Sequence, residues 1–267
     1  MVVPVRRENN FRRLQYIKVE EQELLKRGQD LARQVISKGR PAVTDFLDPA
    51  SLDMLKLNLA RRGEVGMRAD GGYEGAERQR LVLFPPDWPE QQADSQIVCL
   101  EITGSFGDKS PSHRDYLGAL LGLGIRREKL GDILVERERA LVFADKKVAR
   151  VILEQLTAVS IWPVTVRQVE KEQIVVPDKS YREIKASVAS LRLDAVAAAG
   201  FGLSRSKILP FIAAGYVQLN WRECLNPADR VQAGDVISLR GRGRIKVVDA
   251  GGTSRRGRTF VLLHRYV

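Results

Sequence analysis

The 267-residue chain is poor in the residues on which much enzyme chemistry depends. It has two cysteines, two histidines and an aromatic content of 6%. Cys99 and Cys224 lie far apart, and neither has a second cysteine or a histidine at the spacing of metal ligands. We therefore expect both to be small core residues in a reducing compartment, and we expect no metal, no nucleophilic triad and no cofactor.

Long apolar runs are absent as well, which argues against a helix that spans a membrane. The first residues, MVVPVRRENNFRR, are basic but lack the apolar segment of a secretory signal, so that a fragment of a transit peptide is the remaining alternative. We expect a cytoplasmic protein, or one of the plastid stroma if the source is a plant or an alga, with no membrane partner.

Charge is plentiful and unevenly distributed. The net charge is +11, yet residues 181–267 hold 15 Lys and Arg against 6 Asp and Glu, whereas the preceding 180 residues hold 29 against 27. The positive field thus belongs to the C-terminal third. Such asymmetry indicates a polyanionic partner, for which nucleic acid fits better than an acidic membrane. The alternative is a basic surface that serves solubility alone.

The length and a hydrophobic content of 44% predict two or three small domains. In the first, residues 1–90, apolar spacing predicts a helix over 20–38 and a second helix that Asp48 caps, with Pro49 in its first position. A glycine-rich turn then leads to a strand at 79–84. Residues 85–95, PPDWPEQQADS, have the composition of a linker or a domain boundary.

The pattern over residues 96–172 predicts a β-α-β-β-α-β domain. Strands are expected at QIVCLEITG, GDILVE, ALVFAD and WPVTVRQVE, and helices at KKVARVILEQL and SHRDYLGALLGLG, where Ser112 and Asp115 have capping-box spacing. This is the ferredoxin-like, split βαβ order, which RNA-recognition domains share. Those domains stack bases on exposed aromatic side chains of the central strands, where this sequence offers Phe143 alone. The sequence gives little support to base stacking on this sheet.

After a linker expected at residues 171–187, the basic third predicts a compact module over 182–267 with its core at 188–249. It has helices at SLRLDAVAAAG and from Ser204 onwards, followed by strands at YVQLN, DVISLR and IKVVD. The last strand, RTFVLLHRYV, is expected to pair with residues 244–249. Pro210 removes a backbone hydrogen bond inside the second helix, so we expect a kink or an early turn there. The fold class is α+β.

Several of these motifs resemble known families. The segments RLDAVAAAGFGLSRSKILPFIAAGYVQLNWR and VQAGDVISLRGRGRIKV resemble the S4 domain, a small RNA-binding module of a ribosomal protein. HRDYLGALLGLGIRREKLGDILV and GGYEGAERQRL resemble the YlmH-like proteins, which carry an S4 domain behind a two-part N-terminal region. The branch that looks most similar is the cyanobacterial and plastid one, the photosystem II S4 domain proteins.

The resemblance implies a non-enzymatic RNA-binding protein that associates with the ribosome. The expected partners are structured RNA, namely rRNA of the large subunit with tRNA as a second candidate, and no small-molecule substrate is implied. YlmH-like relatives act in nascent-chain quality control on obstructed ribosomes. Recognition is expected to depend on RNA shape and phosphates, because A-form helices hide their base edges from side chains.

The residues themselves indicate where RNA binds. Arg205 and Lys207 lie in the first turn of the helix that Ser204 caps, where the macrodipole already repels cations. A phosphate at this helix N-terminus turns the repulsion into attraction, and the hydroxyl groups of Ser204 and Ser206 add donors. We therefore expect Arg205 to have no carboxylate partner within the protein and to face the 240–246 hairpin.

A second group of cations surrounds that glycine hairpin. Because alternate residues of a strand share a face, its four cations can all point the same way; they are Arg240, Arg242, Arg244 and Lys246. With three neighbouring side chains they are predicted to form one groove that follows an RNA backbone. These neighbours are Arg192, Asn220 and Arg222. Trp221 is open to a base contact or to a place in the core.

Other functions stay open. R-L-D at 192–194 also occurs in RNA pseudouridine synthases that carry S4 domains, where the aspartate is catalytic. Here Ala-Val-Ala follows instead of threonine and glycine, so Asp194 is expected to cap the helix start or to form a salt bridge there. HRD at 113–115 lacks the other kinase motifs, and GALLGLG lacks the context of a dinucleotide site. The alternatives are an RNA-modifying enzyme with Asp194 as nucleophile, or a protein-binding scaffold.

Overall fold

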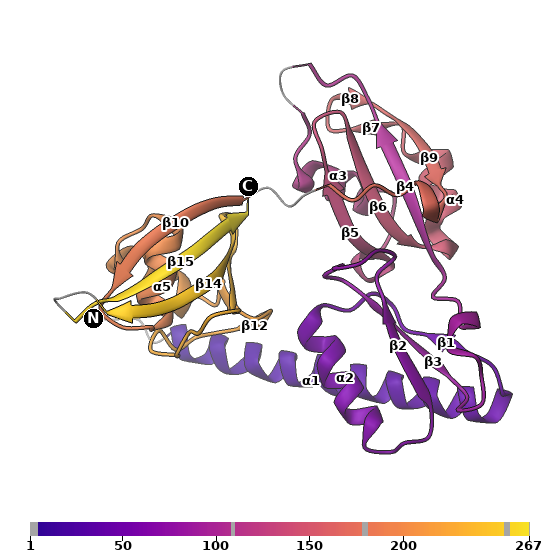
Figure 1. The fold of residues 1–267 in the computed structure, drawn as a ribbon, viewed down its shortest axis with the longest axis horizontal. Helices are drawn as coiled ribbons and strands as arrows, with labels where there is room; N and C mark the ends of the chain where they lie inside the picture. The colour runs from indigo at the N-terminus through magenta and orange to yellow at the C-terminus, as the bar shows by residue number, and fades with distance from the viewer. Residues whose placement is uncertain (1–4, 108–109, 178–180, 254–256, 267) are drawn as a thin grey trace. The chain divides into compact units, whose positions relative to one another are not determined.

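The computed structural model describes residues 5–107, 110–177, 181–253 and 257–266. It comprises two compact units, which are described one after the other. Phe11–Pro177 form the larger unit, and Asp178–Val267 with the first ten residues form the C-terminal unit. Both contain helices and strands (Figure 1), which confirms the α+β prediction. Each has an apolar core of its own.

The larger unit begins with two helices packed on a small sheet. α1 (Val5–Lys38) starts well before the predicted residue 20, because that stretch carries too few apolar residues to mark a helix by spacing. α2 (Pro49–Ala60) starts where expected, and Asp48 accepts a hydrogen bond from the Ser51 amide. The strands, in the spatial order β1-β3-β2, are β1 (Ala42–Val43), β2 (Gly66–Asp70) and β3 (Arg80–Phe84). Their core includes Leu55, Leu59 and Leu81.

The rest of the larger unit is the predicted β-α-β-β-α-β domain. Its antiparallel sheet has the order β5-β6-β4-β9, as in a split βαβ arrangement, and Ser112 and Asp115 form the expected capping box. The main elements are β4 (Ile97–Thr103), α3 (His113–Gly122), β5 (Leu130–Val135), β6 (Arg139–Asp145), α4 (Lys146–Gln155) and β9 (Thr165–Val169). Short elements join them: η1 (Glu90–Gln92), η2 (Arg127–Lys129), β7 (Ala158–Val159), β8 (Trp162–Pro163) and η3 (Lys171–Gln173).

Both faces of this sheet carry packed side chains. α3 and α4 cover one face, where Tyr116, Leu120 and Ile152 are fully buried. On the other face Phe143 is fully buried, and its ring centroid lies 4.7 Å from that of Tyr73, which belongs to the glycine-rich segment before β3. Phe143 is therefore closed to a base, in agreement with the sequence analysis.

Asp132 on β5 holds that glycine-rich segment in place. It accepts hydrogen bonds from the Tyr73 hydroxyl at 2.7 Å and from the backbone amides of Glu77 at 2.7 Å and Arg78 at 3.0 Å. Gly72 is required here, since its φ is +91° and a Cβ would lie 2.5 Å from the Phe143 ring. The segment GGYEGAERQR is thus part of the packing of the larger unit.

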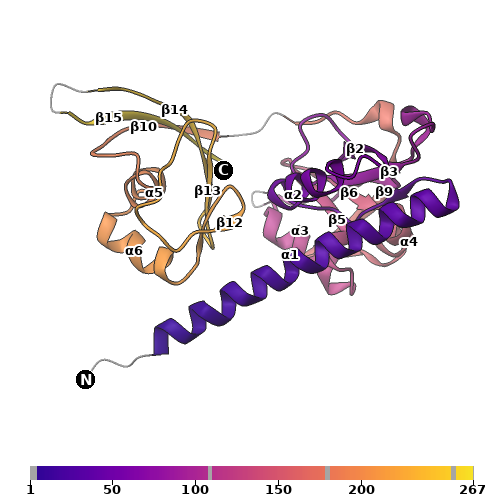
Figure 2. The same ribbon diagram turned by 90° about the horizontal axis from the view of Figure 1, so that it is seen from below.

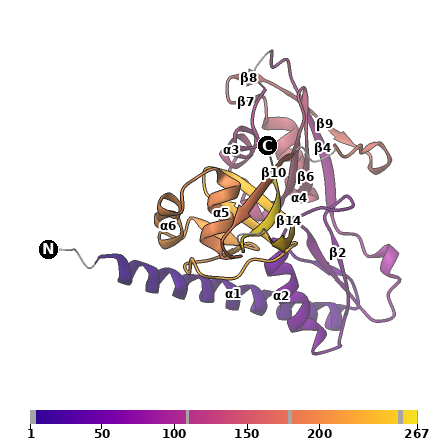
Figure 3. The same ribbon diagram turned by 60° about the vertical axis from the view of Figure 1, so that its left-hand side comes forward.

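The C-terminal unit is a six-stranded antiparallel sheet with two helices on one of its faces (Figure 2). Helices α5 (Leu193–Phe201) and α6 (Arg205–Ala213) lie beside each other (Figure 3). The last strand pairs with residues 245–253, which confirms the prediction that it pairs with the segment around 244–249. In spatial order the strands are β10 (Tyr181–Val188), β15 (Thr259–Tyr266), β14 (Gly243–Thr253), β13 (Val236–Leu239), β11 (Val217–Leu219) and β12 (Arg222–Glu223).

The predicted linker at 171–187 is wrong over its second half. Residues 181–188 form β10, which pairs along its whole length with β15, from Tyr181 opposite Tyr266 to Val188 opposite Thr259. Its sequence, YREIKASV, alternates as expected for a half-buried edge strand. Its partner β15 lies about 70 residues later in the chain. Local composition does not reveal such a distant partner, and by itself it favoured a linker.

Alternation along the strands gives the sheet a core face and an outer face. Ile245, Val247 and Leu263 are fully buried on the core face, and the residues between them point to the outer face. α5 is apolar on nearly every side and is buried almost throughout. Gly200 permits its close approach to the sheet, because a Cβ there would lie 2.3 Å from the Ile245 side chain.

Pro210 does not end α6. The helix continues to Ala213, and Ile212 beyond the proline is fully buried, so the expected early turn is wrong. The chain turns after the helix instead, where Gly215 has a φ of +72°. Pro210 and Ser206 are both exposed. Water can therefore bind the Ser206 carbonyl in place of the N–H that proline lacks.

Candidate nucleic-acid interface

The start of α6 presents a polar and exposed first turn. Ser204 is the N-cap, as predicted: its Oγ accepts a hydrogen bond from the Lys207 amide at 3.3 Å and lies 2.9 Å from Ser206 Oγ. Residues 204–207 are all exposed. Hydroxyl groups and the N–H groups of a first helical turn are the donors that phosphates bind, so this turn has the chemistry of an anion site.

Arg205 has a carboxylate partner, contrary to expectation. Its guanidinium donates to Asp194 on α5 at 2.5 Å; the arginine side chain is 54% exposed, whereas that of Asp194 is 2% exposed. The predicted repulsion at this helix end is therefore wrong for Arg205, because a buried negative charge offsets it. Packing of α5 against α6 creates the contact, and apolar spacing along the sequence does not reveal it.

Asp194 also holds a second arginine. Arg192 donates from Nε to Asp194 Oδ1 at 3.2 Å. Burial raises the pKa of Asp194, but the hydrogen bonds from Arg205 and Arg192 outweigh burial, so that the pKa lies below its usual value. Asp194 is thus charged at neutral pH, and it orients two guanidinium groups. Each guanidinium has five N–H donors, more than one carboxylate uses.

Sequence reasoning missed Arg230. An isolated antiparallel bridge pairs it with Arg192, and Arg230 is exposed. Residues opposite each other in such a bridge project to the same face, so the two arginines are neighbours. Long-range backbone pairing alone shows this. We call the four cations around the starts of α5 and α6 the helix-side cluster; they are Arg192, Arg205, Lys207 and Arg230.

The cations of the glycine hairpin are not part of this cluster. Arg240 and Arg242 lie in the turn between β13 and β14. The guanidinium of Arg240 lies 5.6 Å from the ring centroid of Tyr216, just beyond the C-terminal end of α6. Arg205 is at the other end of that helix and is directed to Asp194. The two groups thus lie at opposite ends of α6, and one groove that contains both stays a prediction.

Arg244 and Lys246 belong to β14 and point away from the helix-side cluster. They alternate with Ile245 and Val247, which are fully buried on the core face. The two cations share a face, as predicted, but it is the outer face of the sheet, opposite to the helices. Strand alternation applies to these two residues and not to Arg240 and Arg242, because the latter lie in a turn.

The turn between β11 and β12 is tightly held. Asn220 and Trp221 both have left-handed backbone, with φ of 50° and 63°. The Asn220 amide nitrogen donates to Asp235 at 2.8 Å, and its oxygen accepts from the Val236 amide at 2.9 Å. The side chain of Asn220 thus fixes the turn, while Arg222 is exposed beside it. A left-handed φ is unusual for a side chain as large as that of Trp221.

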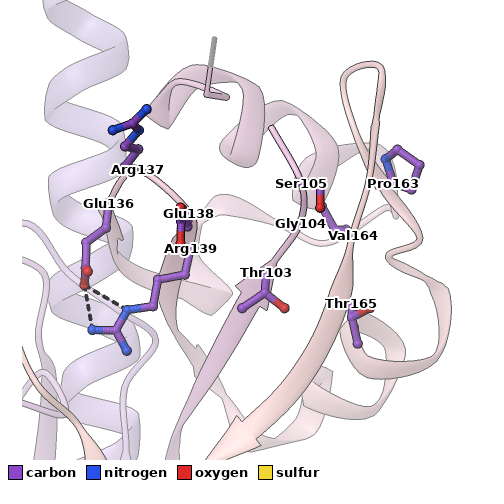
Figure 4. A pocket seen from close by; sticks show the side chains of 10 residues that line it. All are labelled: Thr103, Gly104, Ser105, Glu136, Arg137, Glu138, Arg139, Pro163, Val164 and Thr165. Atoms are coloured by element: carbon purple, nitrogen blue, oxygen red, sulfur yellow. Dashed lines mark hydrogen bonds and ion pairs between the residues drawn. The ribbon is translucent and has the colours of Figure 1, made fainter. Parts of the chain in front are cut away.

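A pocket of about 810 Å³ lies at one end of the four-stranded sheet β5-β6-β4-β9 of the larger unit (Figure 4). Its wall includes Glu136 and Glu138 together with Arg137 and Arg139. Arg139 donates to Glu136 at 3.1 Å and to the buried Glu101 at 3.0 Å. Because acidic and basic side chains balance there, the pocket has no excess charge that would attract a phosphate.

Cys99, Cys224 and Asp194, the side chains that a catalytic alternative would use, are buried. Within the residues that the structure describes, no group of three or more His, Cys, Asp or Glu could hold a metal ion. Burial raises the pKa of the Cys99 thiol to about 12 and that of Cys224 to about 11, so neither is a thiolate at neutral pH. Asp194 is buried and engaged by two arginines.

In the described parts of the chain, no helix is long and apolar enough to cross a membrane.

Three family models match consecutive parts of the chain. Residues 20–88 match the model described as YlmH, N-terminal, residues 89–173 match a putative RNA-binding domain in YlmH, and residues 191–237 match the S4 domain. The S4 match contains the whole helix-side cluster and ends before β14. The chain therefore carries an S4 RNA-binding domain at the place where the cations of α5 and α6 gather.

Whole-chain comparisons agree with these matches. The chain is 30% identical over 253 residues to the ribosome-associated protein quality control protein P2 of Bacillus subtilis (strain 168), covering 94% of this chain and 97% of that protein. A solved structure, the cell division protein ylmH from Streptococcus pneumoniae, is 25% identical with a TM-score of 0.52 over 59% of this chain and 96% of that one. The predicted resemblance is confirmed: the chain belongs to the YlmH family of S4-domain proteins.

Proposed function

We propose that this protein binds structured RNA on the ribosome and takes part in the quality control of nascent chains, without catalysing a reaction. The proposed ligand is rRNA of the large subunit, with tRNA as a second partner. The helix-side cluster carries the proposal, since it places four cations on the S4 domain around the starts of α5 and α6. The name of the Bacillus subtilis relative supports the link to ribosomes.

The cluster suits an RNA backbone because part of it is oriented in advance. Asp194 holds Arg192 and Arg205 before RNA arrives, so less side-chain freedom is lost on binding. Guanidinium groups bind phosphate oxygens through two N–H groups at once. Lys207 and the serine hydroxyls of the first turn add a charge and further donors. A-form RNA presents phosphates and 2′-hydroxyl groups to such a surface.

The test reverses the charge of Lys207, which lies in the exposed first turn. Arg205 is less suitable, because a glutamate there would lie beside Asp194 and disturb the fold. Lys207→Glu is expected to weaken binding to a labelled RNA hairpin, and cosedimentation with large ribosomal subunits, about tenfold. Lys26→Glu on α1 is the control, since it changes an exposed lysine outside the S4 domain by the same charge. Equal losses in both variants would show that net charge alone explains the affinity.

A salt titration separates RNA binding from a protein-binding scaffold. If four phosphates are neutralised, the logarithm of the binding constant should fall with the logarithm of salt concentration with a slope of about −3. Ribosome binding that hardly responds to salt would favour a protein partner. RNA modification is the remaining alternative: an enzyme with Asp194 as nucleophile would produce modified uridine in the bound RNA, and we expect none.

A further inference from the structure

The outer face of the C-terminal sheet combines exposed aromatic rings with cations. It is formed by β10, β15 and β14, which lie side by side (Figure 1), and it is opposite to α5 and α6. All three strands lie entirely outside residues 191–237, which match the S4 domain. Neither the helix-side cluster nor the S4 match therefore accounts for the side chains on this face.

Several aromatic residues lie on this face, and Tyr266, which is opposite Tyr181 in the β10–β15 pairing, is one of them. Tyr181 on β10 and His264 on β15 are stacked, with ring centroids 3.6 Å apart and an angle of 12° between the planes. Tyr181 is 51% exposed although it belongs to a paired strand, and Phe260, further along β15, is 52% exposed. Phe260 and His264 are four residues apart on one strand, which corresponds to about 13 Å. The face thus has two separate aromatic platforms.

Cations surround these rings. Lys246 lies directly opposite His264 in the β14–β15 pairing, and Arg244 precedes it on the same face. Lys185 on β10 is 82% exposed, and Arg258 lies next to Ser187 at the Phe260 end. Two carboxylates are present as well, of which Glu183 is paired with Lys185 at 3.1 Å; the other is Asp249. Positive charge therefore exceeds negative charge on this face.

We propose that the outer face binds an unpaired segment of the same RNA, with bases stacked on the Tyr181–His264 pair and on Phe260 and with phosphates near Lys246 and Lys185. This inference rests on the proposed function. Aromatic side chains on an open sheet with cations between them are the combination that single-stranded RNA recognises. The charge excess favours RNA over an apolar protein surface as the occupant.

The test compares two RNAs with the full-length protein. One is a blunt hairpin, and the other is the same hairpin with a single-stranded uridine extension. The wild type is expected to bind the extended RNA about tenfold more tightly, which corresponds to about 1.4 kcal/mol. Tyr181→Leu and Phe260→Leu should each reduce this preference several-fold without changing the affinity for the blunt hairpin. Tyr181→Phe, which keeps the ring, should retain the preference.

Several outcomes would overturn the inference. These are a wild type without preference for the extension, leucine variants that keep the preference, or a Tyr181→Phe variant that behaves like Tyr181→Leu. Leucine variants that bind both RNAs normally but no longer cosediment with ribosomes would assign the face to a protein. Lys207→Glu should weaken both RNAs equally, so its failure would count against the helix-side cluster while leaving the test of the outer face intact.

Discussion

Among single residues, Asp194 determines how Arg192 and Arg205 are oriented at the helix-side cluster. A cation in the first turn of a helix is disfavoured by about 0.3–1 kcal/mol. The contact of Asp194 with Arg205 removes this disadvantage in the free protein and fixes the direction of the guanidinium. For the RNA binding proposed at the helix-side cluster, we therefore expect the affinity to come from groups oriented in advance, and not from relief of a repulsion within the protein.

We expect Asp194→Asn to destabilise the C-terminal unit by about 1–3 kcal/mol at neutral pH, because two arginines lose a charged acceptor. The pKa of Asp194 is lowered in the folded protein. Its contribution is therefore fully present above the unfolded pKa of about 3.9 and is lost as the pH falls through the folded pKa. Urea unfolding of both proteins at pH 7 and at pH 3 measures this. A stability difference that is the same at both pH values would contradict the role given to the charge.

Sequence reasoning was accurate for residues whose partners are close in the chain. The Ser204 side chain caps α6 by accepting from the Lys207 amide, and Asp48 caps α2 by accepting from the Ser51 amide. Both caps could therefore be predicted from short motifs. The partner of Arg205 and the neighbour of Arg192 could not, because α5–α6 packing and a bridge between distant segments create them. The salt bridge predicted for Asp194 at the start of α5 is confirmed with Arg192, two residues away, whereas its pairing with Arg205 on α6 could not be predicted.

At the level of helices and strands, α6 shows that propensity can be overridden by packing. Pro210 is unfavourable in the middle of a helix, yet Ile208 before it and Ile212 after it are both fully buried in the same core. The burial of these two side chains keeps the backbone helical on both sides of the proline. An apolar pattern interrupted by one proline is therefore compatible with a continuous helix.

Pro210→Ala is expected to stabilise the C-terminal unit by about 1–3 kcal/mol. Alanine restores the N–H that can donate to the Ser206 carbonyl and has the better helix propensity, and the gain exceeds the entropy that proline removes from the unfolded chain. Leu209→Ala, at an exposed neighbour in the same helix, serves as control and should change stability by at most about 1 kcal/mol. Thermal unfolding measures both; a less stable Pro210→Ala variant would refute the account.

For the protein as a whole, a buried ion cluster joins the two parts of the larger unit. Arg80 on β3 donates to Asp145 at the end of β6 at 3.3 Å, and both side chains are almost fully buried. Lys129 contacts Asp145 at 3.1 Å and also pairs with Asp45. Hydrogen bonds and ion pairs with these cations and the Lys147 amide overcome the effect of burial, so the pKa of Asp145 is below its usual value. The N-terminal sheet and the split βαβ domain are thus held together within one unit.

Asp145→Asn should destabilise the larger unit by about 3–5 kcal/mol, since it leaves the buried Arg80 without its ion-pair partner. Hydrogen exchange on the full chain should show faster exchange in β3, β4 and β6, and unchanged exchange in β14 and β15. Glu154→Gln is the matched control, because Glu154 and its partner Arg150 are 56% and 84% exposed and such pairs contribute little. Equal effects of the two variants would contradict a structural role for the buried cluster.

Local sequence was sufficient for the element order of the split βαβ domain, for the helix caps and for the basic character of the C-terminal third, because these depend on neighbours within a few residues. Tertiary structure was needed to show that β10 pairs with β15, that Asp194 neutralises Arg205, and that the cations of α5, α6 and β14 lie on opposite faces of one sheet. Such features depend on which distant segments meet, and pairing between distant segments leaves no periodic trace in the chain.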